Sequence, residues 1–229
     1  MIFIDKVKYG LFSVVSKTII LLFVFSSFAH ADSQIRILML GDSLTQGYGL
    51  EEKKGLVPKL QNWLSTNNVE VLLINGGVSG DTTLGGFERL DWLLTPNING
   101  VVVALGGNDL LRGFDPKFTK NNLQAIFKNL KSKGINSVIV GTISPINYGP
   151  QFKKEYDAIY PSLAREYNLS YIDSLFSPLI DKKTQEISVN LLQADGIHPN
   201  EKGVEAIVNY IGPVIRDFTD SLSPVSYTH

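Results

Sequence analysis

Five short apolar runs alternate with longer amphipathic stretches along this chain. The runs are rich in Ile, Val and Leu, and they lie at residues 35–40, 69–74, 101–105, 137–143 and 169–172. Such runs are typical of strands that are covered on both faces. The stretches between them place apolar residues at helical spacing. Five alternations of strand and helix therefore predict a parallel sheet between two layers of helices.

The predicted helices lie at residues 51–66, 87–94, 115–134, 152–167 and 204–215. Asp115-Pro116 is a typical helix start and Gly134 a typical helix end, whereas Pro161 is expected to kink or break the fourth helix. No internal repeat, linker or low-complexity tract interrupts the pattern. We expect one α/β domain, a three-layer α/β/α sandwich with a flavodoxin-like, five-stranded parallel sheet in the order 2-1-3-4-5.

The first 31 residues have the pattern of an export signal. Three lysines lie within residues 6–17, an apolar stretch follows at residues 19–28, and Ala29-His30-Ala31 matches an A-x-A cleavage site. The alternative is a membrane anchor, but roughly ten apolar residues are too few to span a bilayer. We expect removal of residues 1–31, a mature domain of residues 32–229, and a periplasmic or secreted location without a membrane span.

Composition excludes several kinds of site. The formal net charge is −1 and no basic run occurs, which argues against a nucleic-acid partner. The chain has no cysteine, so it has no disulfide, thiol nucleophile or cysteine-bound metal. Of three histidines, His30 lies in the export signal and His229 is the last residue, so only His198 remains. That count argues against a multi-histidine metal site. We expect no metal or other cofactor, and a monomer.

Ser43 is a candidate nucleophile because of its place after the first apolar run. Gly41-Asp42-Ser43 follows that run directly. In an open parallel sheet, ligands bind at the carboxyl ends of the strands, which is where Ser43 is expected to lie. The alternative is that Asp42 and Ser43 only form a turn or cap a helix.

His198 is the only histidine inside the predicted folded region, so an imidazole base for Ser43 would have to be His198. Asp195 lies three residues earlier, so a tight turn can bring its carboxylate to one ring nitrogen while the other points outward. The segment follows the fifth predicted strand and is therefore expected at the same sheet edge as Ser43. The alternative is an ordinary surface histidine in a loop.

Hydrogen-bond donors for an oxyanion are expected in the loops after the second and third strands. The Gly80 amide and the Asn108 side chain lie in these loops, and the Ser43 amide adds a third donor. Alone, each is equally explained by turn formation. The loop at 144–149, with Pro145, Ile146 and Tyr148, is expected either to flank an acyl groove or to pack against the sheet edge.

These residues fall into a known pattern. Gly41-Asp-Ser-Leu44, Gly80 within residues 77–82, Gly107-Asn-Asp109 and Asp195-x-x-His198 resemble, in order, the four signature blocks of the SGNH (GDSL) hydrolases. Four further segments resemble the periplasmic branch of this family, at residues 106–113, 147–149, 159–161 and 195–200. That branch comprises multifunctional acyl-CoA thioesterase, lysophospholipase and arylesterase enzymes. The Gly-x-Ser-x-Gly elbow of α/β-hydrolases is absent around Ser43.

The resemblance implies a role for each site residue. Ser43 would be the nucleophile, His198 the base and Asp195 its orienter, and the Ser43 amide, Gly80 amide and Asn108 side chain would form the oxyanion hole. The implied enzyme is a serine esterase for acyl substrates, such as lysophospholipids, fatty acyl thioesters and aryl esters. An exported enzyme rarely meets acyl-CoA, which favours lysophospholipids or other carboxylic esters. The alternatives are a carbohydrate O-acetylesterase of the same fold and a non-catalytic ligand-binding domain.

Overall fold

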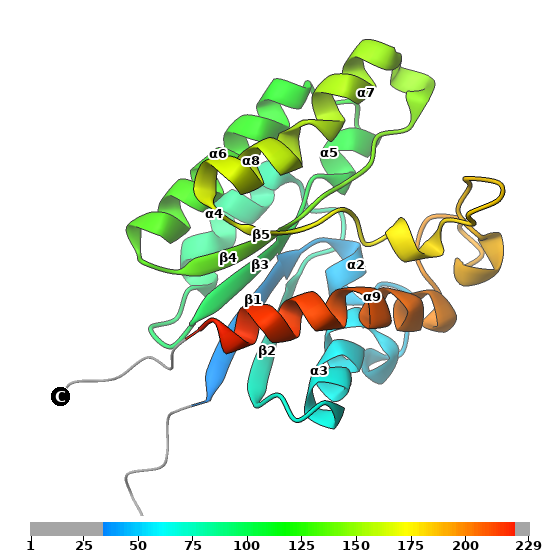
Figure 1. The fold of residues 1–229 in the computed structure, drawn as a ribbon. Helices are drawn as coiled ribbons and strands as arrows, with labels where there is room; N and C mark the ends of the chain where they lie inside the picture. Colours follow the sequence, from blue (N-terminus) through cyan, green and yellow to red (C-terminus); the bar gives the residue numbers. More distant parts are fainter. Residues whose placement is uncertain (1–33, 223–229) are drawn as a thin grey trace, which may run out of the picture. The chain divides into compact units, whose positions relative to one another are not determined.

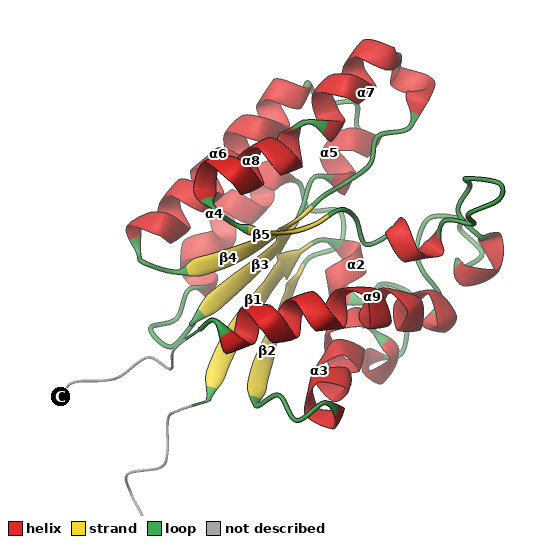
Figure 2. Cartoon of the chain, viewed as in Figure 1, coloured by secondary structure: helices red, strands yellow, loops and turns green. Residues whose placement is uncertain are grey.

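A computed structural model describes residues 34–222 of the chain, so the predicted export signal and its cleavage site lie outside the described residues. Its centre is a parallel sheet of five strands (Figures 1 and 2). The strand order β2-β1-β3-β4-β5 confirms the predicted order. The strands are β1 (Ile35–Gly41), β2 (Val71–Gly77), β3 (Gly100–Ala104), β4 (Asn136–Val140) and β5 (Ser170–Ile172).

Helices cover both faces of the sheet, as Figure 1 shows. One face packs against α3 (Leu56–Thr66) and α9 (Glu201–Asp220). The other face packs against α4 (Thr83–Leu93), α6 (Pro116–Ser132), α7 (Pro150–Asp157) and α8 (Ile159–Tyr167). The remaining short elements are α2 (Ser43–Gln46), α5 (Gly107–Leu111), η1 (Glu52–Lys54), η2 (Ile146–Tyr148), η3 (Ser177–Leu179) and η4 (Val189–Leu191).

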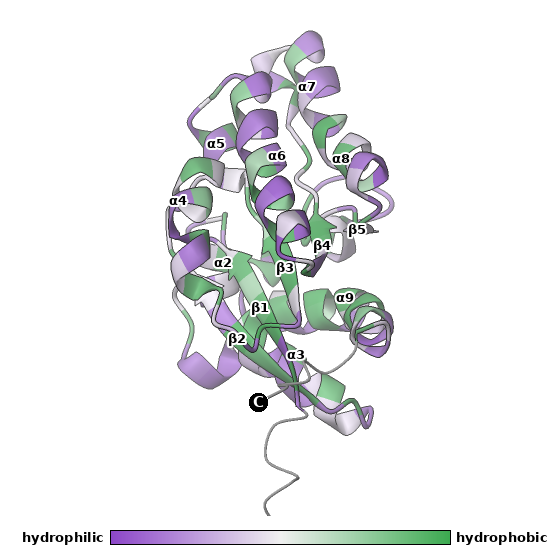
Figure 3. Cartoon of the chain, turned by 90° about the vertical axis from the view of Figure 1, so that its left-hand side faces the viewer, coloured by the Kyte–Doolittle hydropathy of each residue, from purple (hydrophilic) through white to green (hydrophobic). Residues whose placement is uncertain are grey.

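The apolar strands divide their side chains between two cores. In β1, Ile37 and Met39 join the core under α3 and α9, whereas Leu38 and Leu40 join the core on the opposite face. All four side chains are at most 3% exposed. Strands alternate their side chains between the two faces, so a strand buried on both must be apolar at every position. Figure 3 shows the resulting hydrophobic strands beside helices that carry both hydrophobic and hydrophilic residues.

Two strand boundaries differ from the prediction because glycines allow close packing. The loop expected from Asn75 starts later, since residues 75–77 pair with residues 39–41 of β1. A Cβ on Gly77 would lie 2.2 Å from the amide nitrogen of Gln46, so glycine lets α2 pack onto β2. The fourth strand ends at Val140 instead of continuing to residue 143. A Cβ on the next residue, Gly141, would lie 2.2 Å from the Asp173 carbonyl oxygen, so glycine allows the close packing there.

The predicted effect of Pro161 is also found, although upstream of the proline. The helical stripe at residues 152–167 is divided into α7 and α8, with Ala158 between them. Proline has no N–H to donate to the carbonyl four residues earlier, which here belongs to Asp157. The helix is therefore interrupted at that carbonyl, and Pro161 lies in the first turn of α8. In residues 34–222, none of the helices has the length and apolar character needed to cross a membrane.

Candidate active site

Ser43 is the first residue of α2, at the carboxyl end of β1. Asp42 caps this helix, because its Oδ1 accepts the Leu44 N–H at 3.1 Å. A Cβ on Gly41 would lie 2.0 Å from Thr45 Oγ1, so glycine is required where the strand turns into the helix. The predicted cap is thus present at Asp42, while Ser43 is oriented toward other loops at this edge.

The His198 imidazole joins Ser43 to Asp195. Its Nε2 lies 2.9 Å from Ser43 Oγ, and its Nδ1 lies 2.6 Å from Asp195 Oδ2. The structure therefore brings together the three residues that the sequence nominated from positions 155 residues apart. A serine hydroxyl, an imidazole and a carboxylate in this order form the geometry of an activated nucleophile, its base and the group that orients the base.

The Asp195 carboxylate is held in its ionised form. Its Oδ1 accepts the backbone N–H groups of His198 at 3.0 Å and Ile197 at 2.9 Å. These bonds, together with the His198 ring, lower the pKa of Asp195 to about 2. An ionised Asp195 only accepts hydrogen bonds, so these partners assign the proton to Nδ1 and leave Nε2 free to accept the Ser43 proton.

The His198 turn is fixed on both sides. Leu192 forms an isolated antiparallel bridge with Pro199. Asn200 caps α9, with its Oδ1 accepting two amide N–H groups of the first turn, while its Nδ2 donates to the Leu192 carbonyl oxygen at 2.9 Å. The base is therefore held between a bridged loop and the start of a 20-residue helix.

Asn108 reaches the Ser43 turn directly. Its Nδ2 donates to Asp42 Oδ2 at 3.3 Å. The sequence predicted a loop here, but residues 107–111 form the short helix α5. Gly106 precedes this helix with a φ of 116°, and a Cβ there would lie 2.0 Å from the Tyr160 hydroxyl oxygen. A sequence pattern cannot reveal a five-residue helix that depends on such close packing.

The segment from Gly80 to Thr83 is connected to α5 and its C-cap residue by two hydrogen bonds. The φ of Gly80, 79°, lies in the left-handed region that glycine favours, and the Gly80 carbonyl accepts a hydrogen bond from Arg112 Nη2 at 2.8 Å. Three residues later, the Thr83 N–H donates to the buried Asp109 carboxylate at 2.9 Å. The second and third strand-end loops, predicted to converge, are thus bonded to each other.

Asp42 is an unusual carboxylate because it is almost fully buried, at 7% exposed. Burial, opposed by the Leu44 N–H bond and by His198, raises the pKa of Asp42 from 3.8 to about 6. Its two oxygens are both used, one by Leu44 and the other by Asn108. Asp42 therefore both caps α2 and holds the Asn108 amide next to Ser43.

Sequence reasoning gave no role to Arg89 or Arg112. Arg89 Nη2 donates to the Gly41 carbonyl at 2.9 Å, and its Nε donates to Asp81 Oδ2 at 2.7 Å. With the Arg112 bond to Gly80, two guanidinium groups brace the loops around Ser43. Arg112 lies within residues 106–113, which resemble the periplasmic branch, and this resemblance was the only sequence feature that could have indicated a role for it. Arg89 lies mid-helix, where no local pattern distinguishes it from a surface arginine.

The loop at residues 144–149 lies beside the other end of α5. Its η2 turn leaves Ile146 63% exposed, and the Tyr148 hydroxyl donates to the Leu111 carbonyl at 3.4 Å. Pro145 precedes the turn as its cap residue. Two small hollows adjoin the Ser43 turn, and none of these three loop residues lines either of them. A substrate contact by Pro145, Ile146 or Tyr148 stays a prediction.

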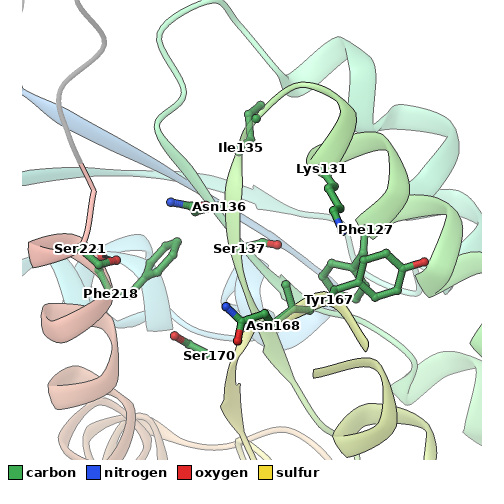
Figure 4. A pocket seen from close by; sticks show the side chains of 12 residues that line it. Phe127, Lys131, Ile135, Asn136, Ser137, Tyr167, Asn168, Ser170, Phe218 and Ser221 are labelled. Carbon is green, nitrogen blue, oxygen red and sulfur yellow. Dashed lines mark hydrogen bonds between the residues drawn. The ribbon is translucent and has the colours of Figure 1, made fainter. Parts of the chain in front are cut away.

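A larger hollow, of about 410 Å³, lies at the opposite edge of the sheet. Figure 4 shows that polar side chains such as Lys131 and Asn136 line it together with aromatic ones such as Phe218. Ser43, Asp195 and His198 do not line this hollow. Cavity volume alone would therefore not select the sheet edge where Ser43 and His198 meet. Within residues 34–222, no cluster of three or more His, Cys, Asp or Glu residues is arranged to hold a metal ion.

The chain is similar to known proteins over most of its length. Residues 39–206 match the model of the GDSL-like Lipase/Acylhydrolase family. An arylesterase of Vibrio mimicus is 32% identical over 197 residues, which cover 85% of this chain and 94% of the relative. Thioesterase 1/protease 1/lysophospholipase L1 of Escherichia coli K12 is 34% identical over 79% of this chain and 83% of its own length. The crystal structure of the psychrotrophic esterase EstA from Pseudoalteromonas sp., inhibited by monoethylphosphonate, has a TM-score of 0.73 and 30% identity, covering 81% of this chain and 99% of that one.

Proposed function

Since this chain belongs to the GDSL-like Lipase/Acylhydrolase family, we propose that it hydrolyses acyl esters with Ser43 as nucleophile, His198 as base and Asp195 as the residue that orients the base. The chain is a hydrolase of ester bonds. The observation that supports these roles is the pair of contacts at His198, 2.9 Å to Ser43 Oγ and 2.6 Å to Asp195 Oδ2.

The reaction proceeds in two steps. Ser43 Oγ attacks the carbonyl carbon of the ester while His198 Nε2 takes the hydroxyl proton. The tetrahedral anion accepts hydrogen bonds from the Ser43 amide, the Gly80 amide and the Asn108 side chain. The imidazolium then protonates the leaving alcohol or thiol, and an acyl ester of Ser43 remains. Water, deprotonated by His198, repeats the attack and releases the carboxylic acid.

Two of the proposed donor groups are held by hydrogen bonds to neighbouring residues. Asp42 accepts one N–H of Asn108, and Arg112 binds the Gly80 carbonyl. A donor group that is already oriented loses little energy to reorganisation when charge develops on the substrate. Asp195 has the corresponding task for the imidazolium, because its anionic form is secured by two backbone N–H bonds.

The substrates that we favour are acyl esters with apolar chains, including lysophospholipids and aryl esters, and also acyl thioesters. Exposed apolar side chains stand in the loops after β1 and β2, at the end of α5 and in η2, where Tyr48, Val78, Leu111 and Ile146 are 45–63% exposed. Apolar side chains that are exposed around a site favour contact with apolar groups of a substrate. Sugar recognition would instead need a dense set of polar side chains.

The Ser43→Ala variant tests the nucleophile. We expect the hydrolysis of p-nitrophenyl acyl esters to fall by at least about 10³-fold, with an unchanged melting temperature. Ser65→Ala, in the exposed part of α3, is the matched control and should keep full activity. A fluorophosphonate should label wild-type protein at Ser43, whose Oγ displaces fluoride from phosphorus. Full hydrolysis by Ser43→Ala would refute the proposal, and absence of labelling would favour a non-catalytic binding domain.

A series of esters from acetyl to palmitoyl separates the substrate classes. We expect rates to rise with chain length before they level off. A sharp preference for acetylated sugars would instead establish the O-acetylesterase alternative.

We further propose export of the chain, removal of residues 1–31 and action in the periplasm. The support is the lysine-rich start, the apolar stretch and Ala29-His30-Ala31. Amino-terminal sequencing of the protein from a periplasmic extract should begin at Asp32. A protein that retains residues 1–31 in the membrane fraction would contradict this.

A further inference from the structure

The aromatic ring of Tyr48 packs against the imidazole of His198. The two ring centroids are 4.6 Å apart and the ring planes are inclined by 38°. Tyr48 is 50% exposed. The ring thus covers one side of the base while its own outer part faces solvent.

Tyr48 is also tied through its backbone to both Ser43 and His198. Its N–H donates to the Ser43 carbonyl at 3.0 Å. Its carbonyl accepts a hydrogen bond from Gln193 Nε2 at 2.8 Å, and the Gln193 N–H donates to the His198 carbonyl at 2.7 Å. Closed by the bond between His198 Nε2 and Ser43 Oγ, these contacts form a ring of hydrogen bonds through four residues. The position of Tyr48 is therefore set by the same segments that carry the nucleophile and the base.

The imidazole needs support of this kind because the site is open to water. The side chain of His198 is 17% exposed and that of Asp195 is 36% exposed. The bonds at Nδ1 and Nε2 act in the plane of the imidazole and do little to stop the ring from tilting out of that plane. An aromatic ring against its face resists this tilt. The face of the Tyr48 ring is electron-rich and attracts the imidazolium that forms during the reaction.

We propose that Tyr48 is a positioning residue, whose ring contact with the His198 imidazole holds the base in place. This inference rests on the proposed function of His198 as the base. A different role for Tyr48 would be contact with the leaving group of the substrate. The two roles differ in their kinetics. Hydrolysis of the acetyl-Ser43 intermediate is common to all acetyl esters and needs the base after the leaving group has departed, whereas a contact with the leaving group acts only before that step.

The test compares Tyr48→Phe, Tyr48→Leu and Tyr48→Met with wild-type protein. Acetyl esters of p-nitrophenol, phenol and ethanethiol serve as substrates that differ only in leaving group. We expect Tyr48→Phe to keep kcat within about 2-fold of wild type, because the ring is retained. Tyr48→Leu and Tyr48→Met should lower kcat by about 3- to 10-fold for all three substrates, with KM unchanged. The rate of Ser43 labelling by a fluorophosphonate should fall by the same factor.

Tyr210→Leu, on α9, is the matched control because Tyr210 is also an exposed tyrosine, at 38%, without contact to His198. It should behave as wild type. The proposal is overturned if Tyr48→Leu and Tyr48→Met keep wild-type kcat, if their loss changes with the leaving group or appears in KM, or if Tyr48→Phe is as impaired as they are. Failure of the proposed function is recognised separately, because wild-type protein would then not be labelled at Ser43.

Discussion

Replacing Asp42 with asparagine removes a buried charge from the turn that carries Ser43. Burial raises the pKa of Asp42 from 3.8 to about 6, roughly 2 pH units. At about 1.4 kcal/mol per unit, ionised Asp42 lowers the free energy of unfolding by up to about 3 kcal/mol at neutral pH. The sign follows from proton binding: between about pH 4 and 6 the folded protein holds this proton more tightly than the unfolded chain, so the contribution of Asp42 to stability falls as pH rises.

Asparagine can still cap α2 but cannot ionise. We therefore expect Asp42→Asn to gain stability relative to wild type as pH rises from 4 to 7.5, by up to about 3 kcal/mol. Urea unfolding followed by circular dichroism at several pH values measures this gain, and groups that titrate equally in both proteins cancel. Asp115→Asn is the matched control, since Asp115 also caps a helix, α6, but is exposed.

The same substitution should reduce activity. With its oxygen bonded to the Leu44 N–H, the introduced asparagine would present an NH₂ group to the NH₂ group of Asn108, and two donors repel each other. Loss of an oriented hole donor lowers kcat by up to about 10²- to 10³-fold. A stability difference that does not change with pH would refute the buried-charge argument. An unchanged kcat would refute the role of Asp42 in holding Asn108.

Three further substitutions test the supports of the site. Arg112→Met removes the bond to the Gly80 carbonyl and should lower kcat about 5-fold at constant KM in ester hydrolysis, equivalent to about 1 kcal/mol. Thr83→Val removes a hydroxyl donor from the buried Asp109 carboxylate and should lower the free energy of unfolding in urea by about 1–3 kcal/mol. Gly106→Ala should lower it by about 2–5 kcal/mol, because its φ is 116° and a Cβ would overlap a tyrosine hydroxyl. Wild-type values in any of these assays would contradict the corresponding contact.

The sheet could be predicted from the sequence because every strand is buried on both faces. Residues such as Val101, Val102 and Val103 leave no polar position, which distinguishes a covered parallel strand from an exposed one. The strand limits were less accurate, because Gly76 and Gly77 look like a loop until their close approach to α2 is known.

The residues around His198 could also be predicted, since the described domain offers one histidine and one nearby carboxylate at the right spacing. The contacts that hold these residues in place could not be predicted from the sequence. Arg89 contacts the Gly41 carbonyl 48 positions earlier, and Arg112 contacts a carbonyl 32 positions earlier. Such contacts depend on how α4 and α5 pack, and a surface arginine has the same local sequence pattern. The hydrogen bond from Asn108 to Asp42 is hidden for the same reason.

The separation of Ser43 and His198 along the chain has a consequence for folding. Ser43 follows the first strand, whereas His198 directly precedes the last helix, 155 residues later. Contacts of such long range form late, since the intervening chain must first be ordered. With the proposed roles of Ser43 and His198, the chain gains esterase activity only after α9 has docked, at the end of folding. The recovery of esterase activity during refolding reports completion of the whole fold, not the formation of any one part of it.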